Sequence, residues 1–229
     1  MCLNATMRPV PLQLRLLAVI VALLGARAPG AAAGPTNAHG VPAKGKFLVA
    51  SKQLGDPNFA ETVVLLIDYG TDGAAGVIIN RPTDVMLAKA LPDLKPLRTR
   101  RDVLYLGGPV AQRALLLLVL AQQPPSHSQS IFGSVHITGS LNTLRRLLDE
   151  NTSRDRWRAY AGYAGWGAGQ LEREVQRGDW YIVPADADTI FKTPAEEMWP
   201  RLIAKSAGQW AMNLPAGLQF ASGLDQATP

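Results

Sequence analysis

Six short apolar runs between residues 46 and 139 constrain the fold of this chain more than any other feature. They are KFLVAS (46–51), ETVVLLIDY (61–69), AAGVIIN (74–80), DVLYLGG (102–108), ALLLLVLA (114–121) and GSVHITG (133–139). Their length and their β-branched content are typical of β-strands. Asp72-Gly73 suits a hairpin turn between the second and third runs. The fourth and fifth runs are apolar throughout, which predicts strands covered on both faces. The polar stretch 122–130 is predicted as an exposed loop.

Three later segments have the boundaries of helices. Ser140 suits the N-cap of a helix whose leucines at 141, 144, 147 and 148 share one face. The segment 170–177 has one apolar side and stops at Gly178. The third helix opens at Thr193 with the spacing of a capping box. Strands outnumber helices and do not alternate with them, so we expect one α/β (α+β) domain with helices packed on a mixed sheet.

The N-terminus has the features of a secretory signal peptide. Arg8 and Arg15 precede an apolar run at 16–26, and small residues follow up to Ala33. The run is about half as long as a bilayer span requires, so we expect no stable membrane span. These features predict that residues 1–33 are a signal peptide, cleaved near Ala33, and that the protein is exported to the periplasm. An uncleaved tether, or a start codon assigned too far upstream, is the alternative; without a functional signal the protein would be cytoplasmic.

Cleavage of the leader would change the charge balance. Loss of Arg8, Arg15 and Arg27 lowers the 23 basic residues to 20, against 18 acidic ones. The small net charge gives no reason to expect nucleic-acid binding, and the basic cluster 95–101 is predicted to be a solvated loop. The only cysteine, Cys2, also lies in the leader, so the mature chain would have no disulfide. We expect a flexible lead-in at 34–45, the domain at 46–205 and a loosely ordered tail at 206–229.

The polar residues form no recognisable catalytic pattern. His39, His127 and His136 lack the spacing of metal ligands and have no clustered carboxylates beside them. We therefore expect no metal and no cofactor. No serine has the Gly-x-Ser-x-Gly surroundings of a nucleophile elbow. Ser134 and His136 alternate along a predicted strand and share a face, which favours a satisfied polar pair over a catalytic dyad.

The stretch AYAGYAGWGAGQLEREV (159–175) places four glycines before a predicted helix. Two interpretations stay open: a tight turn that needs small residues for packing, which we prefer, and a loop that binds a ligand. The glycine spacing matches neither a dinucleotide-binding loop nor a Walker loop. Backbone N–H groups at the helix start suit an anion, but Glu172 and Glu174 already put negative charge there.

Arg81 and a second glycine turn complete a predicted cleft. Arg81 either pairs with an acid such as Asp84 or grips an anionic group. The turn LGGPV (106–110) allows close approach of the backbone. Tyr163 and Trp166 would form flat walls, glycines 165 and 167 would take positive φ, and Gln170 would donate or accept a neutral hydrogen bond. The candidate ligand-binding residues are Asn80, Arg81, Gly107, Gly108, Tyr163, Gly165, Trp166, Gly167, Gly169 and Gln170. The expected occupant is a small anionic ligand or a protein partner.

The order of these segments resembles the YqgE/AlgH family. The resemblance is carried by DPNFAETVVLLIDYGTDGAAGVIINRP, LYLGGPV, AYAGYAGWGAGQLEREV, WYIVPAD and TPAEEMW, over about residues 45–203. It implies a single domain with a curled mixed sheet approaching a partial barrel. The family's name implies a link to transcriptional control of alginate production, but its members have no settled biochemical activity. The chain differs in Lys192, where the family commonly has an acid, and in its leader, because the family is generally not exported.

Three functions follow as hypotheses. The first is an exported, non-enzymatic binding or accessory module with a small cleft. The alternative is a cytoplasmic transcriptional regulator, as the family name implies. The second alternative is an enzyme that uses the same cleft without a cofactor.

Overall fold

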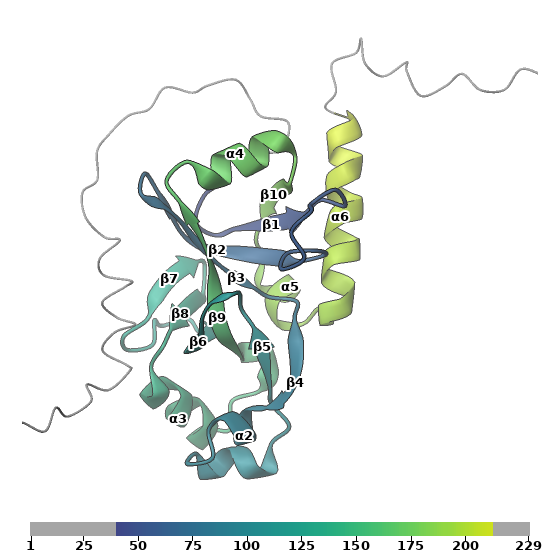
Figure 1. Cartoon of the computed structure of the whole chain (residues 1–229). Coiled ribbons are helices and arrows are strands. Elements are labelled where there is room, and N and C mark those ends of the chain that lie inside the picture. The colour runs from purple at the N-terminus through teal and green to yellow at the C-terminus, as the bar shows by residue number, and fades with distance from the viewer. Residues whose placement is uncertain (1–39, 213–229) are drawn as a thin grey trace, which may run out of the picture. The chain divides into compact units, whose positions relative to one another are not determined.

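The computed structural model describes residues 40–212, with side chains up to residue 206, as a curled mixed sheet with helices on its outer faces (Figure 1). The strands are β1 (Lys46–Ala50), β2 (Val63–Gly70), β3 (Gly73–Ile78), β4 (Pro82–Met86), β5 (Val103–Leu106), β6 (Val110–Leu120), β7 (Gln129–Phe132), β8 (Val135–Thr138), β9 (Trp157–Gly167) and β10 (Trp180–Pro184). The helices are α2 (Leu87–Ala90), α3 (Leu141–Asp149), α4 (Gln170–Arg177), α5 (Ala187–Phe191) and α6 (Ala195–Met212), with short 3-10 turns at Lys95–Thr99 (η1) and Arg154–Arg156 (η2).

The strands of the described residues form one sheet in the order β10-β1-β2-β3-β9-β6-β8-β7, and β4 and β5 join it through β9. Neighbours are antiparallel except β5 and β9, which are parallel. The sheet curls so that its ends approach each other. A Cβ placed on Gly45, just before β1, would lie 3.1 Å from Cβ of Phe132 in β7. The predicted single domain with a curled mixed sheet is confirmed, and its shape is a half-barrel.

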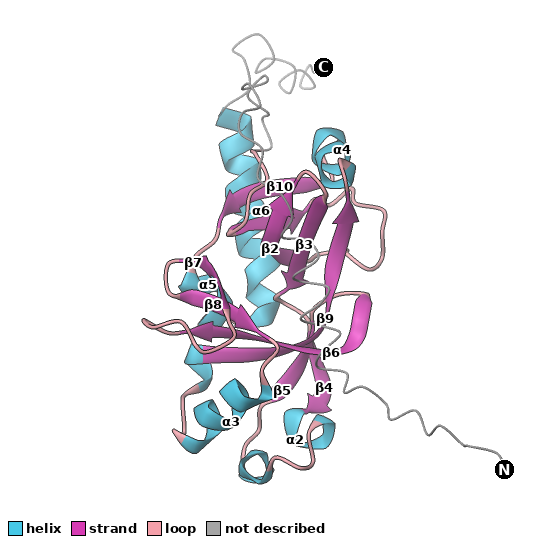
Figure 2. Ribbon diagram, turned by 90° about the vertical axis from the view of Figure 1, so that its left-hand side faces the viewer, coloured by secondary structure: helices cyan, strands magenta, loops and turns pink. Residues whose placement is uncertain are grey.

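Two apolar cores lie along this sheet, and β9 contributes to both. Ala164 and Trp166 pack with Trp180 and with the buried side of α4. Trp157 and Ala159, at the other end of β9, pack with the leucines of α3. Figure 2 shows α4 at one end of the molecule and α2 and α3 at the other, with β9 running between them. The strand therefore connects two separate regions.

The glycine stretch forms the C-terminal half of β9, and only residues 168–169, before α4, form a turn. The predicted tight turn is therefore wrong for most of the stretch, whereas the predicted close packing of its small residues is present. Gly162 has φ +72, and a Cβ there would lie 2.6 Å from the Val110 carbonyl oxygen and 2.7 Å from that of Gly108. Only glycine allows this crossing of β9 under the β5–β6 turn. Two glycines of the stretch have positive φ: Gly162, at the bend of β9, and Gly169, at the start of α4. Glycines 165 and 167, for which positive φ was predicted, do not have it.

The local helix signals are partly confirmed. The Ser140 hydroxyl accepts a hydrogen bond from the Thr143 amide at 3.3 Å, and α4 ends at Gly178 with φ +86. Thr193 behaves differently from the prediction. Its amide and hydroxyl donate to the Asp188 carbonyl oxygen at 3.0 and 3.4 Å, so it closes α5 in place of the expected capping box.

Three short strands and two chain ends differ from the sequence interpretation. β4, β7 and β10 were not expected, and β7 takes up the end of the predicted loop 122–130. Helix α6 continues to Met212, past the predicted domain end at 205, and Gly45 in the lead-in bonds Leu66 through its amide at 2.9 Å. Within residues 40–212 no helix has the length and apolarity needed to cross a membrane.

Candidate functional site

Three of the predicted cleft residues come together in a cavity of about 360 Å³, here called the tryptophan cleft. Gly165 and Trp166 at the end of β9 form one wall, and Gln170 of α4 lies next to them. The loop 54–59 and Trp180 of β10 also line the cavity. The amide of Gly167 donates to Gln170 Oε1 at 3.1 Å, which ties the strand end to the helix start.

Asn80 and Arg81 hold the loop that forms part of the lining of this cleft. The Arg81 guanidinium donates to the carbonyl oxygens of Asn58 at 2.6 Å, Ala60 at 3.1 Å and Pro57 at 3.4 Å. Burial lowers the pKa of Arg81, and the nearby Asp56 carboxylate opposes that shift.

Asn80 adds a second clamp. Its side chain accepts from the Val63 amide at 2.8 Å and donates to the Glu61 carbonyl oxygen at 2.9 Å. The predicted Arg81–Asp84 pair is therefore wrong, because the hydrogen bonds of Arg81 go to backbone carbonyls. Asn80 and Arg81 remain predicted ligand residues, and in the structure they organise the loop.

Gly107, Gly108 and Tyr163 lie elsewhere, at the crossing of β9 with the β5–β6 turn. A Cβ on Gly108 would lie 2.2 Å from the Tyr163 carbonyl carbon, and one on Gly107 would lie 2.4 Å from the Gly162 carbonyl oxygen. The close backbone approach predicted for this turn is confirmed. These three residues do not line the tryptophan cleft.

Glu174 is the residue of this cleft that sequence reasoning missed. One carboxylate oxygen accepts from the indole N–H of Trp166 at 2.8 Å and of Trp180 at 2.9 Å, and the other accepts from the Gln170 amide at 2.9 Å. Phe59 packs against both indoles, at 6.0 Å from the Trp166 ring and 5.5 Å from the Trp180 ring. The spacing of Gln170 and Glu174, four residues apart on a helix, is a signal that could have found this contact.

The charges of the tryptophan cleft are mainly negative. Asp56, Glu174 and Asp179 line it, and the one lining cation, Arg177, is paired with Asp179 at 2.5 Å. Such a surface repels an anion and suits a ligand that donates hydrogen bonds.

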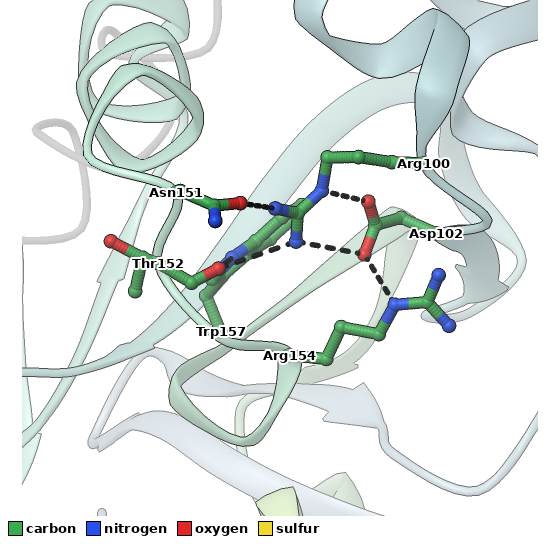
Figure 3. A network of polar contacts seen from close by, with 6 residues as sticks. All are labelled: Arg100, Asp102, Asn151, Thr152, Arg154 and Trp157. Atoms are coloured by element: carbon green, nitrogen blue, oxygen red, sulfur yellow. Dashed lines mark hydrogen bonds and ion pairs between the residues drawn. The ribbon is translucent and has the colours of Figure 1, made fainter.

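A larger cavity of about 540 Å³, the arginine pocket, lies at the other end of β9 and was not expected from the sequence. Asp102 is the buried acid at its wall, with 7% of its side chain exposed. Arg100 donates from Nε to Asp102 Oδ2 at 2.6 Å, and Arg154 places its Nε 3.1 Å from Oδ1 (Figure 3). Arg100 also bonds Asn151 and the Thr152 carbonyl oxygen, each at 3.2 Å. Asp102 is thus shared by two guanidinium groups.

Arg158 of β9 forms a second part of this pocket. Its guanidinium lies 5.2 Å from the centre of the Tyr105 ring and donates to the carbonyl oxygens of Phe191 and Thr193 at 3.2 and 3.4 Å. Burial raises the pKa of Tyr160 well above its ordinary value, and the positive charge of Arg158 opposes that shift. Among the side chains that the structure describes, Nη1 of Arg158 and the Tyr160 hydroxyl are buried and have no hydrogen-bond partner within bonding geometry.

His136 has a polar partner, as predicted, but the partner is a different serine. His136 is buried, and its Nδ1 lies 3.0 Å from the hydroxyl of Ser130 on the neighbouring strand, where Ser134 was expected. Its Nε2 lies 2.9 Å from the Ala121 carbonyl oxygen, which can only accept, so Nε2 carries the proton. In residues 40–212 no group of three or more His, Cys, Asp or Glu side chains is placed to hold a metal ion.

Comparison with known proteins agrees with this architecture. A family model described as AlgH-like matches residues 47–211. The chain belongs to the AlgH-like family. A UPF0301 protein of Streptomyces coelicolor is 33% identical over 175 residues, covering 73% of this chain and 89% of the relative. A UPF0301 protein of Burkholderia vietnamiensis is 38% identical over 165 residues, covering 66% and 82%.

Two solved structures share the fold of this AlgH-like chain. The solution structure of the AlgH protein from Pseudomonas aeruginosa matches with a TM-score of 0.60 and 31% identity, over 86% of this chain and all of that one (100%). A crystal structure of a Corynebacterium diphtheriae protein matches with the same TM-score of 0.60 at 23% identity, over 73% of this chain and 88% of that one. The second match supports the fold alone.

Proposed function

We propose that this AlgH-like protein is an exported, non-enzymatic binding module that holds a small ligand in the tryptophan cleft. The observation that carries the proposal is the fixed geometry of the cleft. Glu174 is held by three donors, and the loop that forms part of the lining is held by Arg81 through three carbonyl oxygens. A cavity whose walls are fixed before binding loses little conformational entropy when a ligand enters.

The size of the cleft and the chemistry of its lining residues limit the class of ligand that it can bind. A cavity of about 360 Å³ lies within the range of small-molecule sites. Asp56 is exposed at its rim and has acceptor oxygens to offer. A neutral or cationic ligand with N–H or O–H groups therefore suits this cleft better than the anion suggested by the sequence.

Export is a separate part of the proposal and depends on residues 1–33, which lie outside the described residues. Intact mass analysis of protein from the native cell should give a mature chain that begins near Gly34. A cytoplasmic protein that retains Met1 or Met7 would contradict export. It would favour the alternative function, the cytoplasmic transcriptional regulator that the family name implies.

Filling the cleft tests the binding module directly. Gly55 lines the cleft and nothing lies within 4 Å of a Cβ there, so Gly55→Leu should fold while its side chain narrows the cleft. Native mass spectrometry of wild-type protein should show a retained small molecule that the variant lacks. Gly70→Leu is the matched control, because nothing lies within 4 Å of a Cβ there. A folded Gly55→Leu that retains the same molecule would refute the cleft as the site.

A further inference from the structure

We infer that the arginine pocket binds a small molecule carrying a carboxylate or phosphate group, at a site separate from the tryptophan cleft. Three features point to this ligand class: the way Arg154 is anchored, the balance of charge in the cavity, and the fixed position of Arg158. The site lies at the other end of β9 and does not depend on the function proposed above.

Arg154 is held in a way that leaves its hydrogen-bonding face free. Its Nε is paired with Asp102, which is itself fixed from the other side by Arg100. Figure 3 shows the two terminal nitrogens of Arg154 pointing away from this network. No hydrogen bond or ion pair to another described residue occupies them, and 56% of the side chain is exposed. An anchored guanidinium of this kind presents two parallel N–H donors, which match the oxygens of a carboxylate or phosphate.

The charge of the cavity favours an anion. Arg154, Arg158 and Lys192 line it, against the carboxylates of Asp102 and Asp155. The single charge of Asp102 is shared between Arg100 and Arg154, so the two guanidinium groups together keep a surplus of positive charge. Lys192 uses one contact on Asp188 at 2.8 Å, and an ammonium group has three donors. The cationic side chains together therefore raise the positive potential where a ligand would enter.

The cavity is large enough for an organic anion and has a rigid wall. Its volume of about 540 Å³ falls within the range of small-molecule sites. Arg158 lies over the Tyr105 ring and is tied to two carbonyl oxygens near the end of α5, so it does not have to be ordered on binding. Val103 and Ala159 add apolar surface for the body of the ligand.

Titration calorimetry of the full chain with benzoate, phenyl phosphate and neutral benzamide tests the inference. Wild-type protein should bind at least one of the two anions and not benzamide. Arg154→Met should weaken binding about ten- to a hundredfold, as expected when charge-assisted hydrogen bonds are lost. Arg154→Lys should fall between, because it keeps the charge and loses the fork. The control is Arg101→Met, which removes an equal charge from an exposed neighbour of Asp102 outside the cavity and should bind as wild type.

The outcomes separate the two sites. No binding of either anion by wild type, or equal weakening by Arg154→Met and Arg101→Met, would overturn the inference. Thermal unfolding of each variant checks that it is folded. If Arg154→Met does not fold, the exposed Lys192→Gln replaces it, with weaker anion binding as the expected result and unchanged binding as the contrary one. Gly55→Leu, which narrows the tryptophan cleft, should keep full anion affinity, so failure of one site is distinguishable from failure of the other.

Discussion

The two ends of β9 stabilise a carboxylate in different ways. At the tryptophan cleft, Glu174 is surrounded by uncharged donors: two indole N–H groups and one amide. At the arginine pocket, Asp102 is neutralised by the guanidinium groups of Arg100 and Arg154. The first arrangement leaves a negative cleft, whereas the second leaves a surplus of positive charge. The same half-barrel therefore offers cavities of opposite charge at its two ends.

The largest expected effect is at Gly162, which lies between the two ends. Gly162→Ala places a methyl group 2.6 and 2.7 Å from two carbonyl oxygens at φ +72, and should cost more than about 3 kcal/mol in the free energy of unfolding. Urea denaturation measures the cost, with Gly165→Ala as the matched control. The control should stay within about 1 kcal/mol of wild type, because its Cβ meets only an ordinary contact. An equal loss of unfolding free energy in the two variants would show that the close approach of β9 to the β5–β6 turn does not require glycine at 162.

A pair of substitutions sharpens the difference between the two carboxylates. Asp102→Asn should cost about 2–4 kcal/mol, because it leaves Arg100, with 15% of its side chain exposed, without a counter-charge. Glu174→Gln should cost less, about 1–2 kcal/mol, because its donors are neutral and one acceptor oxygen remains. Urea denaturation of both variants in one buffer measures the difference. A larger loss for Glu174→Gln would reverse the comparison.

The smallest effect concerns pH at the tryptophan end. Burial, and then the 2.6 Å hydrogen bond to Glu172, raise the pKa of Tyr69 from 10.0 to about 12. Because the folded pKa is the higher one, this contribution is complete below pH 10 and is lost as pH rises towards 12. Its size should be below about 1 kcal/mol, since the pair is partly exposed.

Melting temperatures of wild type and Tyr69→Phe between pH 9 and 12 check this sign, with the range set by the ordinary and raised pKa. Wild type should lose more stability over the range than the variant. Glu172→Gln should reduce the loss without removing it, because burial is the larger cause. Parallel curves for wild type and Tyr69→Phe would contradict the assignment.

The candidate site could be predicted only in part. Gly165, Trp166 and Gln170 were chosen for their position before a helix, and they do line a cavity. Arg81 was expected either to pair with an acid or to grip an anionic group, but a guanidinium at a strand end can equally bind backbone carbonyls, as it does here. Glu174 was assigned only to the helix dipole, because the two indole donors that hold it come from different strands.

The sequence by itself determined the elements whose signals are local. The six short apolar runs, the Ser140 cap and the Gly178 stop depend on neighbours within a few residues, and the structure has strands, a cap and a helix end at these positions. Tertiary structure alone decided that the glycine stretch is a strand. Its bend at Gly162 is required by the close approach of the Gly108 backbone, which is distant in the sequence, and not by neighbouring residues of the stretch. It also decided that Asp102 meets Arg154, since an ion pair between segments far apart in the chain has no period or motif to reveal it.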